Sequence, residues 1–458
     1  MKQTSNYEGE KMMKKKKILL WYDVEDYVTE EAENALLKLL ELMHEYGVRA
    51  TLKLCTKKYE QLIHNGRTDI LELLADHELA FHMTNHSVHP IPSEYLDRMG
   101  FAQGALEFER REGQGFARLK SLTGQNLTSY GHPGVAWAPQ VFPALRKWGI
   151  PTYLDIHDIL RVYGQPFWFG GVLCYTKLNN LAHLDKEKKE CSLIQSVELM
   201  DENDCHEVVF LSMYDHPHEL VCTKFWDSAN FAYGKNPAYL QPAPLREDGE
   251  FERLLEQYRT FFQYVNAHDE IEFVTVQQSM AYEQHRFEPI TAEDVRMAAR
   301  SLGGEAGFFD FHGEWSSASE ILNLMARYLT GRAFLPELIY GPEREETSVL
   351  TSPVSAKELA EAIFSDTKRI FGYKQLQSLY RVGDNFINPV DAFATLSKAV
   401  SEGVSQLEVQ SGRLAAADYV NRDIEFGGGW DLWKEDFRAE NIIEQTVLQT
   451  WTLKPAIF

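Results

Sequence analysis

The segment "AFHMTNHSVHP", residues 80–90, concentrates imidazole side chains, with His82, His86 and His89 inside eight positions. His77 precedes them, so four of the chain's 15 histidines gather here. Neutral imidazole is a common ligand of zinc and related metals. The four-residue spacing of His82 and His86 would, on one helical turn, aim both rings at a single ion. The alternative is a polar loop that happens to be rich in histidine.

A second cluster consists of acids. The segment "WYDVEDY" places Asp23, Glu25 and Asp26 at the end of an apolar run. A zinc site for hydrolysis needs a third ligand besides two histidines, together with an open position for water. Buried carboxylates are costly unless a cation neutralises them, so this triplet indicates a metal. The other interpretation is a solvated turn in which Asp26 or Thr29 caps the following helix.

These polar residues follow predicted strands. Up to about residue 285, short apolar runs alternate with longer amphipathic ones, which is typical of parallel strands joined by helices. Amphipathic patterns predict helices from Thr29, as N-cap, to Gly47 and over Phe251–His268. We predict an α/β fold, a distorted (β/α) barrel, with a doubly wound open sheet as the alternative. The predicted strands are Lys17–Asp23, Arg49–Cys55, Glu78–Met83, Leu127–His132, Pro151–Asp155, Phe167–Thr176, Glu207–Tyr214 and Ile271–Val276.

The carboxyl ends of five of these strands carry polar residues. In a parallel α/β barrel, such ends converge on one face, where sites are built. The sequence therefore predicts a single site assembled from five chain segments. Its candidate residues are Asp23, Glu25 and Asp26 after the first strand, His82 and His86 after the third, His132 and Pro133 after the fourth, Asp155 at the fifth, and Asp215, His216 and His218 after the seventh.

Residues 15–285 resemble the polysaccharide deacetylase family, which includes the NodB homology domain, carbohydrate esterase family 4 and related metal-dependent amidases. "WYDVEDY" is similar to the first motif of that family and implies Asp23 as catalytic base and Glu25 as metal ligand, with Asp26 as the other candidate ligand. "DHELAFHMTNHSVHP" is similar to the second motif and implies His82 and His86 as the metal-binding histidines.

Three further segments resemble the remaining motifs. "GHPGVAW" is similar to the third, although Gly131 stands where the family has an arginine. "TYLDIHD" is similar to the fourth and implies a catalytic role for Asp155, and "LSMYDHPHEL" is similar to the fifth and implies His216 as the catalytic histidine. Together these segments imply substrate or oxyanion contacts for His132, Pro133, Gly134, Trp137 and His218.

The resemblance implies a divalent metal, Zn²⁺ or another such as Co²⁺, Mn²⁺ or Ni²⁺, that lowers the pKa of a water molecule. Asp23 would accept the proton of that water, and His216 would donate a proton to the leaving amine. We expect a carboxylate such as Asp215 or Asp155 to keep His216 charged. Without an arginine at position 131, Asp23 needs another donor, such as His132 or a distant arginine.

Composition excludes other classes of function. The formal charge of −22 over 458 residues argues against a nucleic acid as partner. Five scattered cysteines without a C-x-x-C pair favour reduced thiols over a disulfide framework. The apolar run Ile18–Tyr22 is too short for a signal peptide, and no apolar stretch reaches 18 residues. We therefore expect a cytoplasmic protein that does not contact a membrane.

Near Arg286 the residue pattern changes: apolar runs typical of strands become rare, and amphipathic helical stretches alternate with polar turns. We predict a flexible N-terminus over residues 1–14, a NodB-like catalytic domain over 15–286 and a mainly helical accessory domain over 287–458. "WSSASEILNLMARYLTG" and "INPVDAFATLSKAVSEG", 72 residues apart, are interpreted as two copies of one unit. Near the end, Trp430 and Trp433 are either packing residues or a surface on which a sugar stacks.

The leading hypothesis is a metal-dependent hydrolase that removes N-acetyl or O-acetyl groups from a sugar or polysaccharide. Its partner would be a carbohydrate or a small N-acylated substrate. One alternative is an amidohydrolase that cleaves a non-sugar carbon–nitrogen bond, as in a cyclic imide or ureide. Another is a non-catalytic carbohydrate-binding protein on a deacetylase fold.

Overall fold

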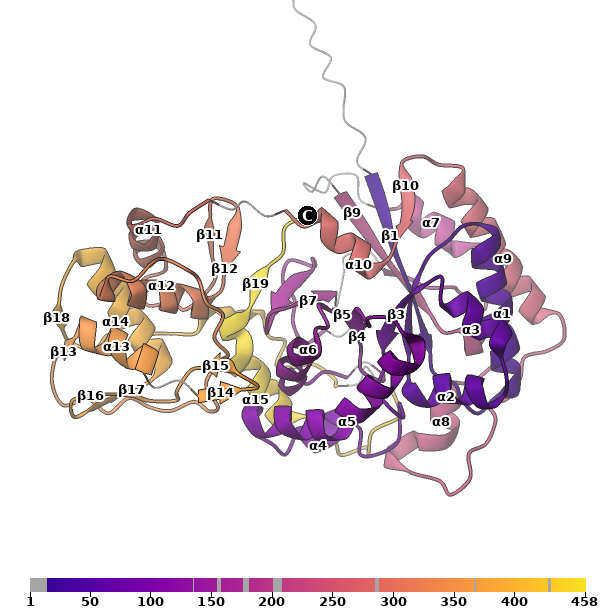
Figure 1. The fold of residues 1–458 in the computed structure, drawn as a ribbon, viewed down its shortest axis with the longest axis horizontal. Helices are drawn as coiled ribbons and strands as arrows, with labels where there is room; N and C mark the ends of the chain where they lie inside the picture. The colour runs from indigo at the N-terminus through magenta and orange to yellow at the C-terminus, as the bar shows by residue number, and fades with distance from the viewer. Residues whose placement is uncertain are drawn as a thin grey trace, which may run out of the picture.

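The computed structural model describes residues 15–134, 136–154, 158–175, 181–200, 208–284, 288–365, 368–426 and 430–458. Two parts lie side by side, and the C-terminal segment runs between them (Figure 1). The larger part is built on an 11-stranded sheet, and the smaller part on helices and two-stranded hairpins. The N-terminal residues 1–14 and the predicted boundary at Arg286 lie outside the described residues.

The central strand of the sheet is β1 (Lys15–Val24), which pairs in parallel with β2, β9 and β10. The pairing order is β19-β6-β7-β5-β4-β3-β2-β1-β9-β8, with β10 joined to β1. Only β6 and β19 run antiparallel to their partners among these described strands. The bounds are β2 (Thr51–Leu54), β3 (Glu78–Phe81), β4 (Ser129–Tyr130), β5 (Thr152–Leu154), β6 (Phe167–Phe169), β7 (Val172–Tyr175), β8 (Leu181–Ala182), β9 (Val208–Asp215), β10 (Ile271–Val274) and β19 (Lys454–Pro455).

The predicted distorted (β/α) barrel is confirmed, and each of the eight predicted strands overlaps an observed one. One prediction needs correction: the segment Phe167–Thr176 is a hairpin of β6 and β7, not a single strand. Gly170 and Gly171 form its turn with φ of 58° and 79°, a backbone conformation that glycine adopts without steric cost. The run of apolar residues in β1 is explained by burial on both faces of a parallel strand.

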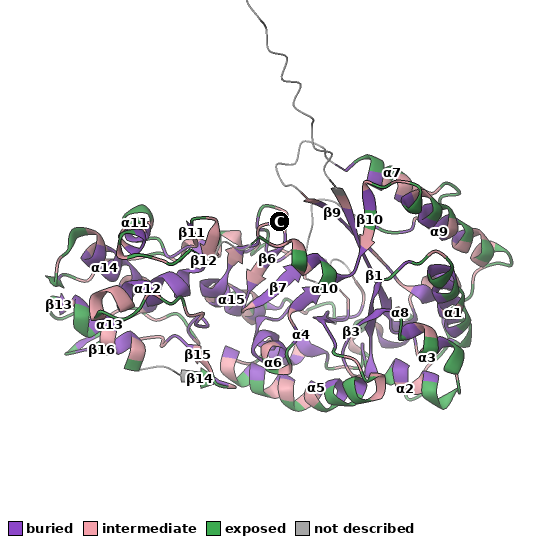
Figure 2. Cartoon of the chain, turned by 45° about the horizontal axis from the view of Figure 1, so that its top comes forward, coloured by how far each residue is buried: buried purple, intermediate pink, exposed green. Residues whose placement is uncertain are grey.

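Helices cover the strands, and the sides of the helices that face the sheet are buried while the outer sides are exposed (Figure 2). The predicted helix after β1 is α1 (Glu30–Glu45), and Gly47, with φ of 65°, follows its end. The second predicted helix is α9 (Glu250–Asn266). The others of this part are α2 (Thr56–His64), α3 (Thr68–Leu74), α4 (Pro92–Leu96), α5 (Phe101–Thr123), α6 (Phe142–Trp148), α7 (Ser192–Glu198), α8 (Trp226–Phe231) and α10 (Val276–Ser279).

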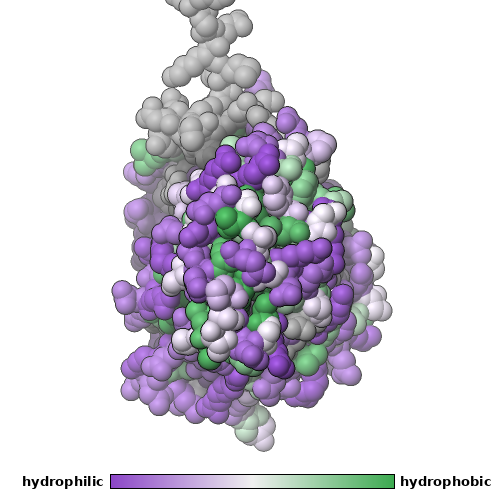
Figure 3. All heavy atoms as spheres, turned by 90° about the vertical axis from the view of Figure 1, so that its left-hand side faces the viewer, coloured by the Kyte–Doolittle hydropathy of each residue, from purple (hydrophilic) through white to green (hydrophobic). Residues whose placement is uncertain are grey.

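The smaller part has its own hydrophobic core. In it, the segments over residues 309–331 and 380–403 each form a hairpin followed by a helix that ends at a left-handed glycine. Its end face is mostly hydrophilic, with small separate hydrophobic areas (Figure 3). The elements are α11 (Ala292–Leu302), β11 (Phe309–Phe311), β12 (Glu314–Ser316), α12 (Ala318–Thr330), β13 (Val354–Ser355), α13 (Ala356–Ser365), β14 (Lys368–Ile370), β15 (Tyr373–Gln375), β16 (Tyr380–Val382), β17 (Asn385–Ile387), α14 (Pro389–Glu402) and β18 (Gln406–Leu407).

The C-terminal segment belongs to both cores. Ile442, on α15 (Glu440–Gln449), and Leu453 are buried in the core of the barrel, whereas Trp451 is buried in the core of the smaller part. The next residues, β19, add an antiparallel strand to β6. The end of the chain therefore fixes the smaller part against the barrel. In the part of the chain that the structure describes, no helix combines the length and apolarity needed to span a bilayer.

His77 makes the barrel sensitive to acid. Its Nδ1 accepts a hydrogen bond from the backbone N–H of Ala50 at 3.1 Å, and burial lowers its pKa from 6.5 to about 4. Above pH 6.5 the ring is neutral in the folded and unfolded chain alike. Between pH 6.5 and 4 only the unfolded chain binds the proton. The free energy of unfolding therefore decreases as the pH is lowered through this range, by up to about 3 kcal/mol.

We expect the free energy of unfolding of His77→Gln to change less than that of the wild type between pH 6.5 and 4. Urea unfolding of the wild type and of His77→Gln at pH 8, 6 and 5 measures the difference. An identical loss of unfolding free energy between pH 8 and 5 in the two proteins would contradict this role for His77.

Candidate active site

Three of the predicted metal ligands meet at the carboxyl end of the sheet. Glu25 Oε2 lies 3.1 Å from His82 Nε2 and 2.6 Å from His86 Nε2, and the two Nε2 atoms lie 3.1 Å apart. All three side chains are buried. The ligands of a tetrahedral zinc ion with bonds of about 2.05 Å are about 3.3 Å apart. These donor atoms therefore have nearly the spacing needed to hold one ion.

Hydrogen bonds fix both imidazoles in the form that binds metals. His82 Nδ1 lies 2.9 Å from the carbonyl oxygen of Gly131, which can only accept, so the proton is on Nδ1 and the lone pair on Nε2. His86 Nδ1 lies 2.5 Å from Ser87 Oγ, whose own hydrogen is donated to Asp227. The Nε2 lone pairs of both rings consequently face the Glu25 carboxylate. Such a group of electron-pair donors is stabilised by a cation.

The loop that carries the two histidines is irregular, and the prediction that they share a helical turn is wrong. Met83 and His86 have φ of 69° and 55°, a left-handed conformation that is unfavourable for residues other than glycine. The loop is held by Glu112 of α5, which accepts hydrogen bonds from the backbone and the hydroxyl of Thr84 at 2.9 Å and 2.6 Å. The strained loop turns the imidazole of His86 back toward His82.

The structure distinguishes the two candidate carboxylates of the first motif. Asp26 Oδ1 accepts hydrogen bonds from the backbone N–H groups of Val28 and Thr29 at 2.8 Å and 2.9 Å, and so closes the turn before α1. The N-cap residue of α1 is Thr29, and Asp26 bonds the backbone just before the helix without capping it. Glu25, and not Asp26, faces the histidines.

His89 lies outside this cluster. Its Nδ1 pairs with Glu94 at 2.7 Å, and its Nε2 donates to the carbonyl oxygen of Phe231 at 2.9 Å. The ring therefore connects the histidine loop to α4 and α8.

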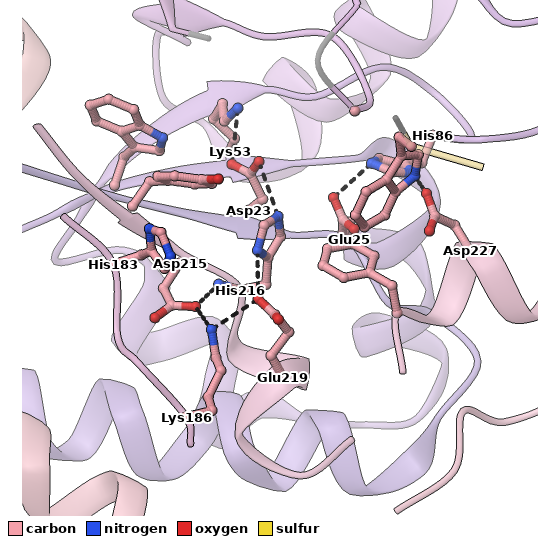
Figure 4. A pocket seen from close by; sticks show the side chains of 15 residues that line it. Asp23, Glu25, Lys53, His86, His183, Lys186, Asp215, His216, Glu219 and Asp227 are labelled. Atoms are coloured by element: carbon pink, nitrogen blue, oxygen red, sulfur yellow. Dashed lines mark hydrogen bonds and ion pairs between the residues drawn. The ribbon is translucent and has the colours of Figure 1, made fainter. Parts of the chain in front are cut away.

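The predicted base and acid lie next to each other (Figure 4). Asp23 Oδ2 is 3.5 Å from His216 Nε2, and Asp23 Oδ1 is 3.0 Å from Lys53 Nζ. His216 Nδ1 is 3.0 Å from Glu219 Oε2. Burial alone would lower the pKa of His216, but its hydrogen bonds to Asp23 and Glu219 hold it well above the usual value. His216 is therefore protonated at neutral pH.

The ion pairs continue beyond His216. Lys186 Nζ lies 3.1 Å from Glu219 Oε2 and 2.6 Å from Asp215 Oδ1. Positive and negative side chains thus alternate from Lys53 to Asp215, as the dashed lines of Figure 4 show. The carboxylate that contacts Nδ1 of the His216 ring is Glu219, and not Asp215 as expected. Asp215 accepts a hydrogen bond from the backbone N–H of His216. Asp155, the other expected partner, lies outside the described residues.

The remaining predicted contacts divide into two groups. Gly134 lines the pocket, with φ of 61° and the Trp433 ring close to its Cα. Trp137 is fully buried in the core, where its Nε1 donates to Thr446 of α15. The structure places four of these residues away from the lining of the main pocket: His132, Pro133, Trp137 and His218.

His218 lies in a second, smaller pocket next to the predicted metal ligand Glu25. It lines a small pocket with Glu25 and Asp26, and its ring packs edge-on against Phe225 at 4.4 Å between centroids. Burial lowers the pKa of His218 to about 4, so the ring is neutral.

The pocket at this site has a volume of about 240 Å³ and is lined by charged and aromatic side chains. Among its aromatic residues, Trp21 and Tyr214 stack with ring centroids 6.0 Å apart, and Phe225 meets Trp430 edge-on at 4.6 Å. Trp430 is contributed by the C-terminal segment. The lining residues are Trp21, Asp23, Glu25, Lys53, His86, Gly134, His183, Lys186, Tyr214, Asp215, His216, Glu219, Phe225, Asp227 and Trp430.

Several site residues were not predicted. Lys53 carries a detectable signal, because a lysine inside the apolar strand "TLKL" must find a buried partner. Glu219 lies in the fifth motif but had no assigned role. Trp226, whose Nε1 donates to Glu25 Oε1 at 2.9 Å, and Asp227 come from α8, for which the sequence shows no signal of function.

No protein-family model and no curated protein matches the chain. Similar solved structures include a probable polysaccharide deacetylase from Pseudomonas aeruginosa PAO1, with 14% identity over 60% of this chain and 93% of that one and a TM-score of 0.37. The allantoinase Puue has 11% identity over 58% and 89%, with a TM-score of 0.36. A 4-α-glucanotransferase from Thermococcus litoralis has 14% identity over 60% and 41%, with a TM-score of 0.41, so the chain spans about two fifths of its length.

A matched pair of variants tests the choice of carboxylate. We expect Glu25→Gln to lose zinc, with an affinity more than about 100-fold lower, because removing a ligand costs more than removing a residue that supports one. Asp26→Asn should keep its zinc, since its Oδ1 can still close the turn. Titration calorimetry with Zn²⁺ measures both affinities. Loss of zinc in Asp26→Asn with retention in Glu25→Gln would reverse the assignment.

Proposed function

We propose that the protein is a metal-dependent hydrolase of carbon–nitrogen bonds that removes the acetyl group from an N-acetylated sugar. O-acetyl removal would use the same site. The observation that carries this proposal is the placement of Asp23 and His216 beside the donor set of Glu25, His82 and His86. All of these except His82 line one pocket. A metal, a base and an acid are the groups that amide hydrolysis requires.

The donor set fits a divalent metal such as zinc. One carboxylate and two neutral imidazoles are a typical ligand set of catalytic zinc, which keeps a further position open. A metal held by Glu25, His82 and His86 would polarise the carbonyl group of the substrate and lower the pKa of water. Trp226 and the Ser87–Asp227 pair support these ligands from behind, through the hydrogen bonds described above.

The chain's own residues would handle the protons. Asp23 Oδ2 lies 3.7 Å from His82 Nε2, so it is placed to accept a proton from water that attacks next to the metal ligands. His216, protonated and fixed by Glu219, would donate a proton to the leaving nitrogen. An amine is a poor leaving group without that proton, so both residues are required.

The pocket supports a small substrate. A volume of about 240 Å³ lies below the roughly 300–1,000 Å³ of clefts that hold drug-sized ligands. The aromatic side chains that line the pocket suit stacking against a single sugar ring. This size also favours the second candidate, an amidohydrolase that opens a cyclic imide or ureide, because such a ring fits the same space.

The base can be tested separately from the metal. We expect Asp23→Asn to bind zinc as the wild type does and to lose about 10²- to 10⁴-fold in kcat, the usual contribution of general base catalysis. Zinc content and acetate release from N-acetylglucosamine are measured on the same preparations. Full activity in Asp23→Asn would contradict its assignment as the base.

A substrate panel distinguishes the candidates. We expect acetate to be released from N-acetylglucosamine or its short oligomers by the zinc-loaded protein, and removal of zinc by a chelator should abolish the release. Opening of a cyclic imide or ureide without acetate release would favour the amidohydrolase. Failure to take up zinc, cobalt, manganese or nickel would leave only the non-catalytic alternative.

A further inference from the structure

Lys53 is a buried lysine in the middle of the sheet. It is the third residue of β2, between Leu52 and Leu54, and its side chain is 3% exposed. In the parallel register of β1 and β2, Lys53 lies beside Asp23. Neighbouring residues in register point to the same side of a sheet, so the ammonium group reaches the Asp23 carboxylate directly.

Burial makes this ion pair consequential. A lysine ammonium removed from water without a partner costs several kcal/mol. Among the described residues, the ion-pair partner of Lys53 is Asp23, whose Oδ1 lies 3.0 Å from Lys53 Nζ. The pair leaves Oδ2, the other oxygen of Asp23, directed toward His216 and His82. Lys53 therefore determines which oxygen of Asp23 faces the reaction.

The third motif has no room for the arginine that the family resemblance implied. A Cβ atom at Gly131 would collide with the carbonyl oxygen of Leu154 and would lie 2.7 Å from Lys53 Nζ. The Gly131 carbonyl, in turn, accepts the hydrogen bond of His82. The space next to Gly131 is thus filled by backbone and by the ammonium group, which enters from β2.

We propose that Lys53 is the positioning residue of the base Asp23, in place of a cation from the third motif. This inference rests on the proposed function for the role of Asp23 as base. The ion pair itself does not depend on that role. Within the described part of the chain, no arginine pairs with Asp23, whereas Lys53 does. The ring of His132 lies 3.4 Å from the Tyr153 hydroxyl.

Removal and chemical replacement of the ammonium test this role. Lys53→Met keeps the length of the side chain without its charge, and we expect kcat for acetate release to fall about 10- to 100-fold while zinc content and KM stay close to the wild type. Lys53→Ala leaves a space that fits n-propylammonium. This cation should restore part of kcat and raise the melting temperature of Lys53→Ala, whereas the neutral 1-propanol should do neither.

Lys58→Met is the matched control. Lys58, on α2, is equally buried, but it pairs with Glu33 of the neighbouring helix α1 at 3.6 Å. Its loss should leave kcat unchanged even where stability falls. A kcat of Lys53→Met within twofold of the wild type would overturn the proposal. The proposal would also be overturned if 1-propanol restored the kcat of Lys53→Ala as well as n-propylammonium does, or if Lys53→Ala lost its zinc.

The melting temperature separates this proposal from the proposed function. If the wild type hydrolyses none of the substrates, the function fails, but a rise in the melting temperature of Lys53→Ala with n-propylammonium still demonstrates the ion pair. If the wild type is active and n-propylammonium changes neither kcat nor the melting temperature of Lys53→Ala, the proposed function stands and the role of Lys53 fails.

Discussion

The site is organised by the burial of two carboxylates, Asp23 and Glu25, at the end of the central strand. Each carboxylate is almost fully enclosed, so each needs positive charge or hydrogen-bond donors within reach. Asp23 meets this need through Lys53 and His216. Glu25 faces the Nε2 atoms of His82 and His86 and the indole N–H of Trp226, an arrangement suited to a bound cation.

The same constraint explains why distant segments surround β1. The strand has β2 on one side and β9 on the other, so Lys53 and His216 reach Asp23 from opposite neighbours. Glu219 and Lys186 extend the alternation of charge away from the base, and each buried charge in this row contacts one of opposite sign. Removing one member would leave its neighbours with uncompensated charge, which links the stability of the barrel to the arrangement of the site.

The C-terminal segment connects the site to the smaller part of the protein. It adds β19 to the sheet and places α15 against the core of the barrel. The residues before α15 bring Trp430 to the pocket and Trp433 to Ser93, where its Nε1 donates at 2.9 Å. One wall of the pocket therefore depends on the last residues of the chain, more than 400 positions away from Asp23 in the sequence.

The sequence by itself determined the barrel and its strands, and it predicted that His82 and His86 lie near Asp23 and His216. These features depend on local patterns, because apolar runs mark buried strands and parallel strands bring their carboxyl ends to one face. The tertiary structure decided which carboxylate faces the two histidines, Glu25 and not Asp26. It also decided the contacts of His216 with Glu219 and of Lys53 with Asp23. Those results depend on side-chain directions and on register between strands, which the pattern of residue types does not encode. Trp430 and Trp226 reach the site only through long-range packing, and no local signal in the sequence carries that information.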